Sequence, residues 1–258
     1  MYWRHRRGVL SLDTPILMGI LNITPDSFSD GGRYPNVETA VRRALEMVNE
    51  GATIIDVGGE STRPGFTPVS AEEESRRAIP VIETLRKNSP GMVISIDTSK
   101  ASVAEKALEA GANIVNDVHG LRDSDMVEVV RRYHAGAVIM HNAQCTMHNI
   151  AEQVAYELSE RVKDVERTGI PRDTLCLDPG FGFGKRGDEN WALLRGLKKI
   201  VDLGYPVLVG GSRKHFIPSD NGSVNFAIEA IRQGARIVRV HDVRETIDAT
   251  QRRRDFST

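Results

Sequence analysis

The alternation of short apolar runs with longer amphipathic stretches constrains the fold of this chain more than any other feature. Eight runs rich in valine and isoleucine recur, at residues 16–21, 53–57, 93–96, 114–116, 137–140, 175–177, 207–210 and 237–240. Most are nearly continuous in apolar residues, which is typical of parallel strands covered on both faces. Eight amphipathic stretches with helical spacing follow them, at residues 37–49, 71–85, 103–108, 126–133, 150–165, 193–203, 224–231 and 243–250. This pattern predicts an α/β fold, a single (β/α)8 TIM barrel.

The length of the chain fits one domain of this kind. A chain of 258 residues is long for an average domain but ordinary for one such barrel. Because no linker, repeat or low-complexity tract interrupts the alternation, residues 1–258 are predicted to form one domain. A doubly wound open sheet is the alternative, but the G-x-G-x-x-G phosphate fingerprint typical of that fold is absent.

The composition argues against several classes of partner. The 34 basic and 35 acidic residues nearly balance, so nothing indicates a nucleic acid or a membrane surface. The two cysteines, Cys145 and Cys176, form neither a disulfide framework nor a zinc-ligand spacing. Since no secretory signal or membrane-length apolar run is evident, we expect a cytoplasmic protein. The basic residues at 4–7 and 252–254 are interpreted as solvated ends of the chain.

Polar residues follow every predicted strand. In a barrel the loops after the strands share one face, and that face carries the active site. The residues delivered there include Asn22, Glu60, Asp97, Asn116, His141, Asp178, Ser212 and Arg239. Each has an ordinary explanation when taken alone, such as Asp97 acting as the N-cap of the next helix. Their agreement at all eight strand ends favours a catalytic face.

Three of these residues are short hydrogen-bond acceptors. Asp97, Asn116 and Asp178 follow the third, fourth and sixth strands, and they are expected to meet deep in the barrel. Buried carboxylates need donors to offset their desolvation, and the amino-pyrimidine edge of a pterin supplies paired N–H groups. The apolar side chains of Met140 and Phe183 are suited to pack on the flat faces of such a ring.

A second group is cationic and follows the seventh and eighth strands. Arg213, Lys214, Arg239 and His241 lie where this fold commonly binds phosphate. Asn22 suits Mg²⁺, which binds through one or two protein oxygens together with phosphate. Because no nucleophilic constellation is apparent, the residues favour displacement of a diphosphate leaving group with metal assistance.

Two long motifs resemble the signatures of the dihydropteroate synthase family. They are NITPDSFSDGG at residues 22–32 and GESTRPG at residues 59–65. Shorter matches follow in the family order, at residues 97–100, 116–120, 140–141, 178–185, 212–217 and 239–243. The resemblance extends from about residue 18 to the end of the chain and identifies it as a member of this pterin-binding TIM-barrel family.

This resemblance implies an activity. The family condenses (7,8-dihydropterin-6-yl)methyl diphosphate with 4-aminobenzoate, giving 7,8-dihydropteroate and diphosphate in folate biosynthesis. The resemblance further implies an SN1-like displacement, Mg²⁺ as cofactor, inhibition by sulfonamides and a homodimer. No nucleic-acid or membrane partner is expected.

The resemblance also implies roles for individual residues. Catalytic roles map to Lys214, Arg63, Phe28 and Asp30. Substrate binding maps to Thr62, Pro64, Asp97, Asn116, Met140, Asp178, Phe183, Ser212, Lys214, Arg239, Val240 and His241. The metal-binding role maps to Asn22.

The sequence departs from the family pattern in two places and leaves two alternatives open. The segment 142–149 lacks the proline usual in the family, and the segment 218–222 is shorter than usual. One alternative is a paralogue that binds the pterin without turnover. The other is a methyltetrahydrofolate-type methyltransferase, which would explain the acceptors but would not need the cations at residues 212–214 and 239–241.

Overall fold

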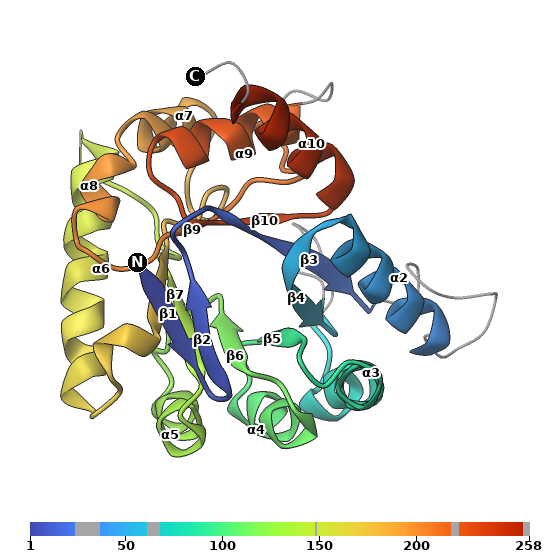
Figure 1. Ribbon diagram of the computed structural model, residues 1–258. Helices are drawn as coiled ribbons and strands as arrows, with labels where there is room; N and C mark the ends of the chain where they lie inside the picture. Colours follow the sequence, from blue (N-terminus) through green and yellow to red (C-terminus); the bar gives the residue numbers. More distant parts are fainter. Residues whose placement is uncertain (24–36, 61–67, 148, 218–221, 255–258) are drawn as a thin grey trace.

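Parallel strands form a barrel in this computed structural model, which describes residues 1–23, 37–60, 68–147, 149–217 and 222–254 (Figure 1). The barrel strands are β3 (Ile16–Asn22), β4 (Ala52–Gly58), β5 (Val93–Asp97), β6 (Ile114–Asp117), β7 (Gly136–Met140), β8 (Leu175–Asp178), β9 (Leu208–Gly210) and β10 (Ile237–Val240). They pair in the order β8-β7-β6-β5-β4-β3-β10-β9, and a parallel bridge between Leu177 and Val207 links the two edges. The predicted TIM barrel is therefore confirmed, with all eight strands in the predicted places.

The helices pack around the outside of the strands (Figure 1). They are α2 (Val37–Glu50), α3 (Ala71–Asn88), α4 (Ala101–Ala110), α5 (Ser124–Tyr133), α6 (Ile150–Arg167), α7 (Asp188–Arg195), α8 (Lys198–Val201), α9 (Gly222–Arg232) and α10 (Val243–Arg254), with a 3-10 turn η1 (Arg172–Thr174) before β8. Within the described ranges, no helix has the length and apolar character needed to cross a membrane.

One predicted helix is wrong. The stretch 193–203 was expected to be continuous, but α7 ends at Arg195 and α8 begins at Lys198. A Cβ atom on the intervening Gly196 would lie 2.4 Å from the Cβ of Ala151 in α6. The chain therefore breaks where a residue without a side chain allows close contact with α6.

A hairpin that was not predicted precedes the barrel. Strands β1 (Tyr2–His5) and β2 (Gly8–Ser11) pair antiparallel and lie across one end of the barrel in Figure 1. The side chain of Trp3 is fully buried, and its indole N–H donates to the carbonyl oxygen of Thr174 at 2.8 Å. The hairpin therefore closes the N-terminal end of the barrel.

The expectation that residues 4–7 are solvated is wrong for part of the cluster. The guanidinium of Arg4 pairs with Asp173 at 2.6 Å, and Arg6 donates to the carbonyl oxygen of Leu108. His5 is 7% exposed. These side chains hold the hairpin onto the barrel, whereas Arg7 is exposed as expected.

The core has two layers that follow from the two faces of the strands. An inner cluster joins Trp3 and Leu12 to strand residues such as Met18, Ile54 and Val138. A larger outer cluster fills the space between the strands and the helices. Because apolar side chains fill the closed end of the barrel, the polar strand ends are left to the opposite end.

Candidate active site

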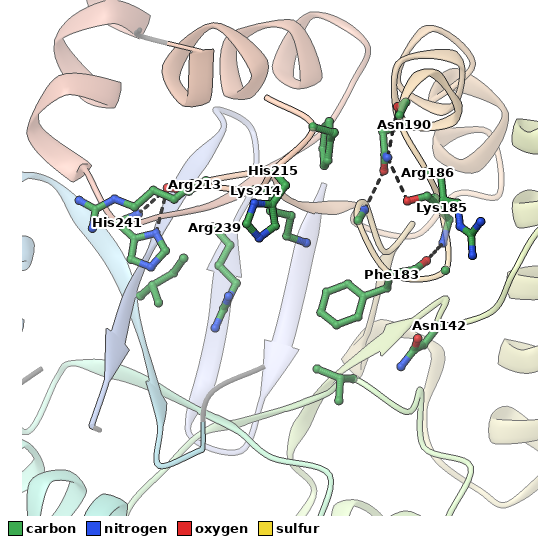
Figure 2. Close-up of a pocket in the computed structure, with 18 of the residues that line it drawn as sticks. Asn142, Phe183, Lys185, Arg186, Asn190, Arg213, Lys214, His215, Arg239 and His241 are labelled. Atoms are coloured by element: carbon green, nitrogen blue, oxygen red, sulfur yellow. Dashed lines mark hydrogen bonds between the residues drawn. The ribbon is translucent and has the colours of Figure 1, made fainter. Parts of the chain in front are cut away.

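A cavity of about 1100 Å³ opens at the C-terminal ends of the strands (Figure 2). The predicted site residues that line it are Asn22, Phe183, Ser212, Lys214, Arg239 and His241. They come from the ends of β3 and β10 and from the loops after β8, β9 and β10. The structure thus brings together residues that are more than 200 positions apart in the sequence.

Four residues predicted to bind the pterin lie buried beside this cavity. Asp97, Asn116, Met140 and Asp178 stand at or near the ends of β5, β6, β7 and β8, and each is 5–7% exposed. Asp97 does not cap the next helix, because α4 begins after Lys100 and the carboxylate accepts instead from Arg239, at 2.5 Å. The guanidinium of Arg239 therefore lies between the cavity and the Asp97 carboxylate.

Asp56, which the sequence analysis passed over, completes this group. Its side chain is fully buried in β4, and its Oδ2 accepts from Arg239 Nε at 2.5 Å and from Asn116 Nδ2 at 3.0 Å. Arg239 thus bridges two carboxylates on neighbouring strands. The signal that identifies Asp56 is an acidic residue inside an otherwise apolar strand, where charged residues are rarely buried without a partner.

Burial moves the pKa values of three ionisable groups at the site toward neutral pH. Burial raises the pKa of Asp97 to about 7, although the guanidinium of Arg239 opposes the shift. Burial likewise raises the pKa of Asp178, with Lys214 opposing. The pKa of Lys214 falls to about 8 because the ammonium is buried, although Asp178 opposes this. Shifts of this kind in a cavity are typical of catalytic sites.

Lys214 and Phe183 lie against each other at the edge of the cavity (Figure 2). The ammonium of Lys214 lies 4.4 Å from the centroid of the Phe183 ring and donates to the carbonyl oxygen of Phe181. A cation over an aromatic face forms a pocket wall that is apolar and positively charged at once. Such a wall suits an aromatic ligand that carries a carboxylate.

The phosphate-binding residues predicted after β9 and β10 have different partners in the structure. His241 Nδ1 lies 2.9 Å from the hydroxyl of Ser212, which joins the two loops at the rim. Arg213 pairs with Asp242 at 2.6 Å, so this guanidinium is held by a carboxylate. Val240 is 4% exposed and belongs to the outer core cluster, which places its side chain outside the cavity.

Five predicted site residues lie outside the described residues. They are Phe28, Asp30, Thr62, Arg63 and Pro64. Their implied roles therefore stay predictions.

The metal prediction rests on Asn22. Among the described residues, no group of three or more histidine, cysteine, aspartate and glutamate side chains is placed to hold a metal ion. Mg²⁺ does not require such a cluster when phosphate oxygens and waters supply most of its ligands. Asn22 provides an amide oxygen at the end of β3 in the same cavity as Arg239 and His241, which fits a metal ion carried by a diphosphate.

Comparison with known proteins supports this interpretation of the cavity. Residues 18–241 match the family model of pterin-binding enzymes. The chain is 43% identical over 247 residues to the dihydropteroate synthase of Clostridium beijerinckii, and the match covers 91% of each chain. The chain belongs to the dihydropteroate synthase family.

Solved structures of dihydropteroate synthases agree. The chain is 42% identical to the enzyme of Xanthomonas albilineans with 4-aminobenzoic acid, with a TM-score of 0.91 over 97% of this chain and 96% of that one. The same enzyme in complex with 7,8-dihydropteroate gives a TM-score of 0.89 at 40% identity, with the same coverage. The Yersinia pestis enzyme with a sulfonamide drug gives 0.89 at 38% identity, covering 96% of each chain. These matches confirm the family and the fold predicted from the sequence.

Proposed function

We propose that this chain condenses (7,8-dihydropterin-6-yl)methyl diphosphate with 4-aminobenzoate, giving 7,8-dihydropteroate and diphosphate. The observation that carries this proposal is one cavity that joins buried acceptors, a cationic rim and an aromatic–ammonium wall. Family membership supports it, because relatives are solved with 4-aminobenzoic acid and with 7,8-dihydropteroate.

The pterin ring is proposed to bind against Asp97, Asn116 and Asp178, with Met140 packing on its face. The guanidinium of Arg239 donates to Asp97 Oδ2. The amino-pyrimidinone edge of a pterin presents adjacent N–H donors much as a guanidinium does. The pterin would therefore replace Arg239 at Asp97, which frees the guanidinium to bind the diphosphate.

The diphosphate is proposed to bind Arg239 and His241 at the rim. Asn22 would hold a Mg²⁺ ion that the diphosphate carries, and this ion would neutralise charge on the leaving group. The carbon–oxygen bond to the diphosphate breaks first, and the electron-rich reduced pterin stabilises the resulting cation. This order fits an SN1-like displacement that requires no protein nucleophile.

The aminobenzoate is proposed to bind against the wall that Phe183 and Lys214 form together. Its amino group then forms the new carbon–nitrogen bond and loses a proton. The ring packs on Phe183, and the ammonium of Lys214 lies close to both substrates. A sulfonamide carries a similar aryl amine, so we expect it to compete at this wall.

Two further predictions concern the whole protein. The resemblance implies a homodimer, which analytical ultracentrifugation of the purified chain would measure directly. The cytoplasmic location stays a prediction from cysteine usage.

The proposed function is tested with purified chain, the pterin diphosphate, 4-aminobenzoate and Mg²⁺. We expect equal amounts of 7,8-dihydropteroate and diphosphate by chromatography, and inhibition by a sulfonamide that 4-aminobenzoate relieves. Tight binding of the pterin diphosphate without any product would contradict the proposal and favour the non-catalytic paralogue. Methyl transfer from a methylfolate to a corrinoid protein would favour the methyltransferase alternative.

A further inference from the structure

The loop after β8 is held by a buried lysine, Lys185. Lys185 is 5% exposed, and its ammonium lies within 3.2 Å of four acceptors. These are the carbonyl oxygens of Phe183 at 2.9 Å, Gly180 at 3.1 Å and His141 at 3.2 Å, and the Nδ1 atom of His141 at 2.9 Å. One side chain therefore ties both ends of this loop to the end of β7.

His141 is itself fixed from the other side. Its Nε2 lies 2.9 Å from the carboxylate of Glu157 in α6, and Gln153 donates to the same carboxylate at 2.7 Å. Burial and the nearby ammonium of Lys185 lower the pKa of His141, so the imidazole is neutral at pH 7. A neutral ring that donates from Nε2 to Glu157 presents Nδ1 as an acceptor to Lys185.

A second buried side chain braces the same loop. Asn190 is fully buried in α7, and its Oδ1 accepts from the N–H of Gly182 at 2.7 Å. Its amide nitrogen donates to the carbonyl oxygen of Lys185 at 3.2 Å. Figure 2 shows Lys185 and Asn190 on one side of the loop and the Phe183 ring on the other, and all three residues line the cavity.

The structure assigns Lys185 the role of a positioning residue that sets the Phe183 wall of the 4-aminobenzoate subsite. This inference rests on the proposed function, because that proposal places the arylamine against the wall of Phe183 and Lys214. Lys185 contacts neither substrate in this arrangement and acts through the backbone of Phe183.

The positions of Asp178 and Phe183, before and within this loop, depend on Lys185 to different degrees. Asp178 is held by the strand ladder of β8, by a hydrogen bond from the His141 N–H to its carbonyl oxygen at 2.9 Å, and by the Gly180 N–H, which donates to its carboxylate. Phe183 lies beyond the strand, where the carbonyl oxygen accepts from Lys185. Loss of the ammonium should therefore displace Phe183 more than Asp178.

The test is the substitution Lys185→Met, which keeps the length of the side chain and removes its donors. We expect KM for 4-aminobenzoate to rise about tenfold or more, as for loss of a charged hydrogen bond. The dissociation constant of the pterin diphosphate, measured by calorimetry, should change less than about threefold, a difference of under ~0.7 kcal/mol. The matched control is Lys198→Met, because Lys198 is 74% exposed in α8, and both constants should stay unchanged.

A second variant covers the case in which Lys185→Met does not fold, which far-UV circular dichroism would reveal. Asn190→Leu removes the other brace, and we expect the same selective rise in KM, smaller in size. Equal losses for the two substrates, or no change in either, would overturn the inference.

Failure of this inference can be distinguished from failure of the proposed function. Absence of 7,8-dihydropteroate with the unmodified chain would contradict the function itself. In that case the dissociation constant of 4-aminobenzoate, measured by calorimetry, still compares Lys185→Met with the control.

Discussion

The two walls of the cavity are built in different ways. The strand-borne wall lies buried beside the cavity and consists of Asp56, Asp97 and Asn116, which stand on β4, β5 and β6 and are fixed by the strand ladders. The loop-borne wall of Phe183 and Lys214 stands on the loops after β8 and β9, and hydrogen bonds with the buried side chains of Lys185 and Asn190 hold the backbone of the first loop. The strand-borne wall is the more rigid, because ladder pairing fixes each residue through its neighbours.

This difference matches the demands of the two proposed substrates. The pterin presents a fixed array of donors, and a small displacement of the carboxylates would break several hydrogen bonds together. The arylamine is proposed to bind at the wall of Phe183 and Lys214, which stands on loops after the strands. We therefore expect substitutions at the strand residues to weaken binding of the pterin, and substitutions at the loop residues to impair binding and reaction of the arylamine.

The largest effect is expected for Lys214→Ala on the loop-borne wall. This change removes the ammonium that lies between Phe183 and Asp178, so we expect kcat/KM to fall about 100- to 1,000-fold. Steady-state rates of 7,8-dihydropteroate formation measure it, with Lys198→Ala as the exposed control. Near-normal rates in Lys214→Ala would remove this residue from the site.

A smaller and more selective effect is expected for Asp97→Asn on the strand-borne wall. The change keeps the shape of the side chain but removes the charge that accepts hydrogen bonds from the pterin. The dissociation constant of the pterin diphosphate should rise about 10- to 100-fold. If calorimetry shows unchanged pterin binding but weaker 4-aminobenzoate binding, the assignment of the two walls is reversed.

The smallest effect is a dependence of the rate on pH. Lys214 has a pKa lowered by burial to about 8, so it carries its charge below this pH and loses it above. We expect kcat/KM to decline as the pH rises through about 8, by up to tenfold per unit. In Lys214→Arg the guanidinium stays charged, so the decline should disappear even if the rate is lower. A decline that persists in this variant would belong to another group, such as Lys185, whose pKa burial also lowers to about 8.

The barrel was predictable from the sequence because its signal is local. Each parallel strand can be recognised from its own run of apolar residues, and the buried face of each helix can be recognised from the spacing of its apolar residues. The hairpin at residues 2–11 was not predictable in this way. Its strands are four residues long, the first contains Arg4 and His5, and Trp3 is buried only because the open end of the barrel lies beneath it.

The polar interior was harder to predict than the fold. Asp97, Asn116 and Asp178 stood out because they end strands, where the fold gathers functional groups. Asp56 lies within a strand, and its partner Arg239 is 183 residues away in the sequence. Lys185 reaches His141 across 44 residues, and nothing in the neighbouring residues shows that its ammonium is buried. Pairings of this kind depend on the closed barrel, so the sequence pattern alone does not reveal them.

The most direct measurement is a crystal structure of the chain with 7,8-dihydropteroate bound. We expect the pterin ring against Asp97, Asn116 and Asp178, and the aminobenzoyl ring against the wall of Phe183 and Lys214. The guanidinium of Arg239 should have left Asp97. A pterin ring bound on the loop-borne wall, or an intact pair between Arg239 and Asp97 beside the bound product, would contradict the division of the cavity into these two walls.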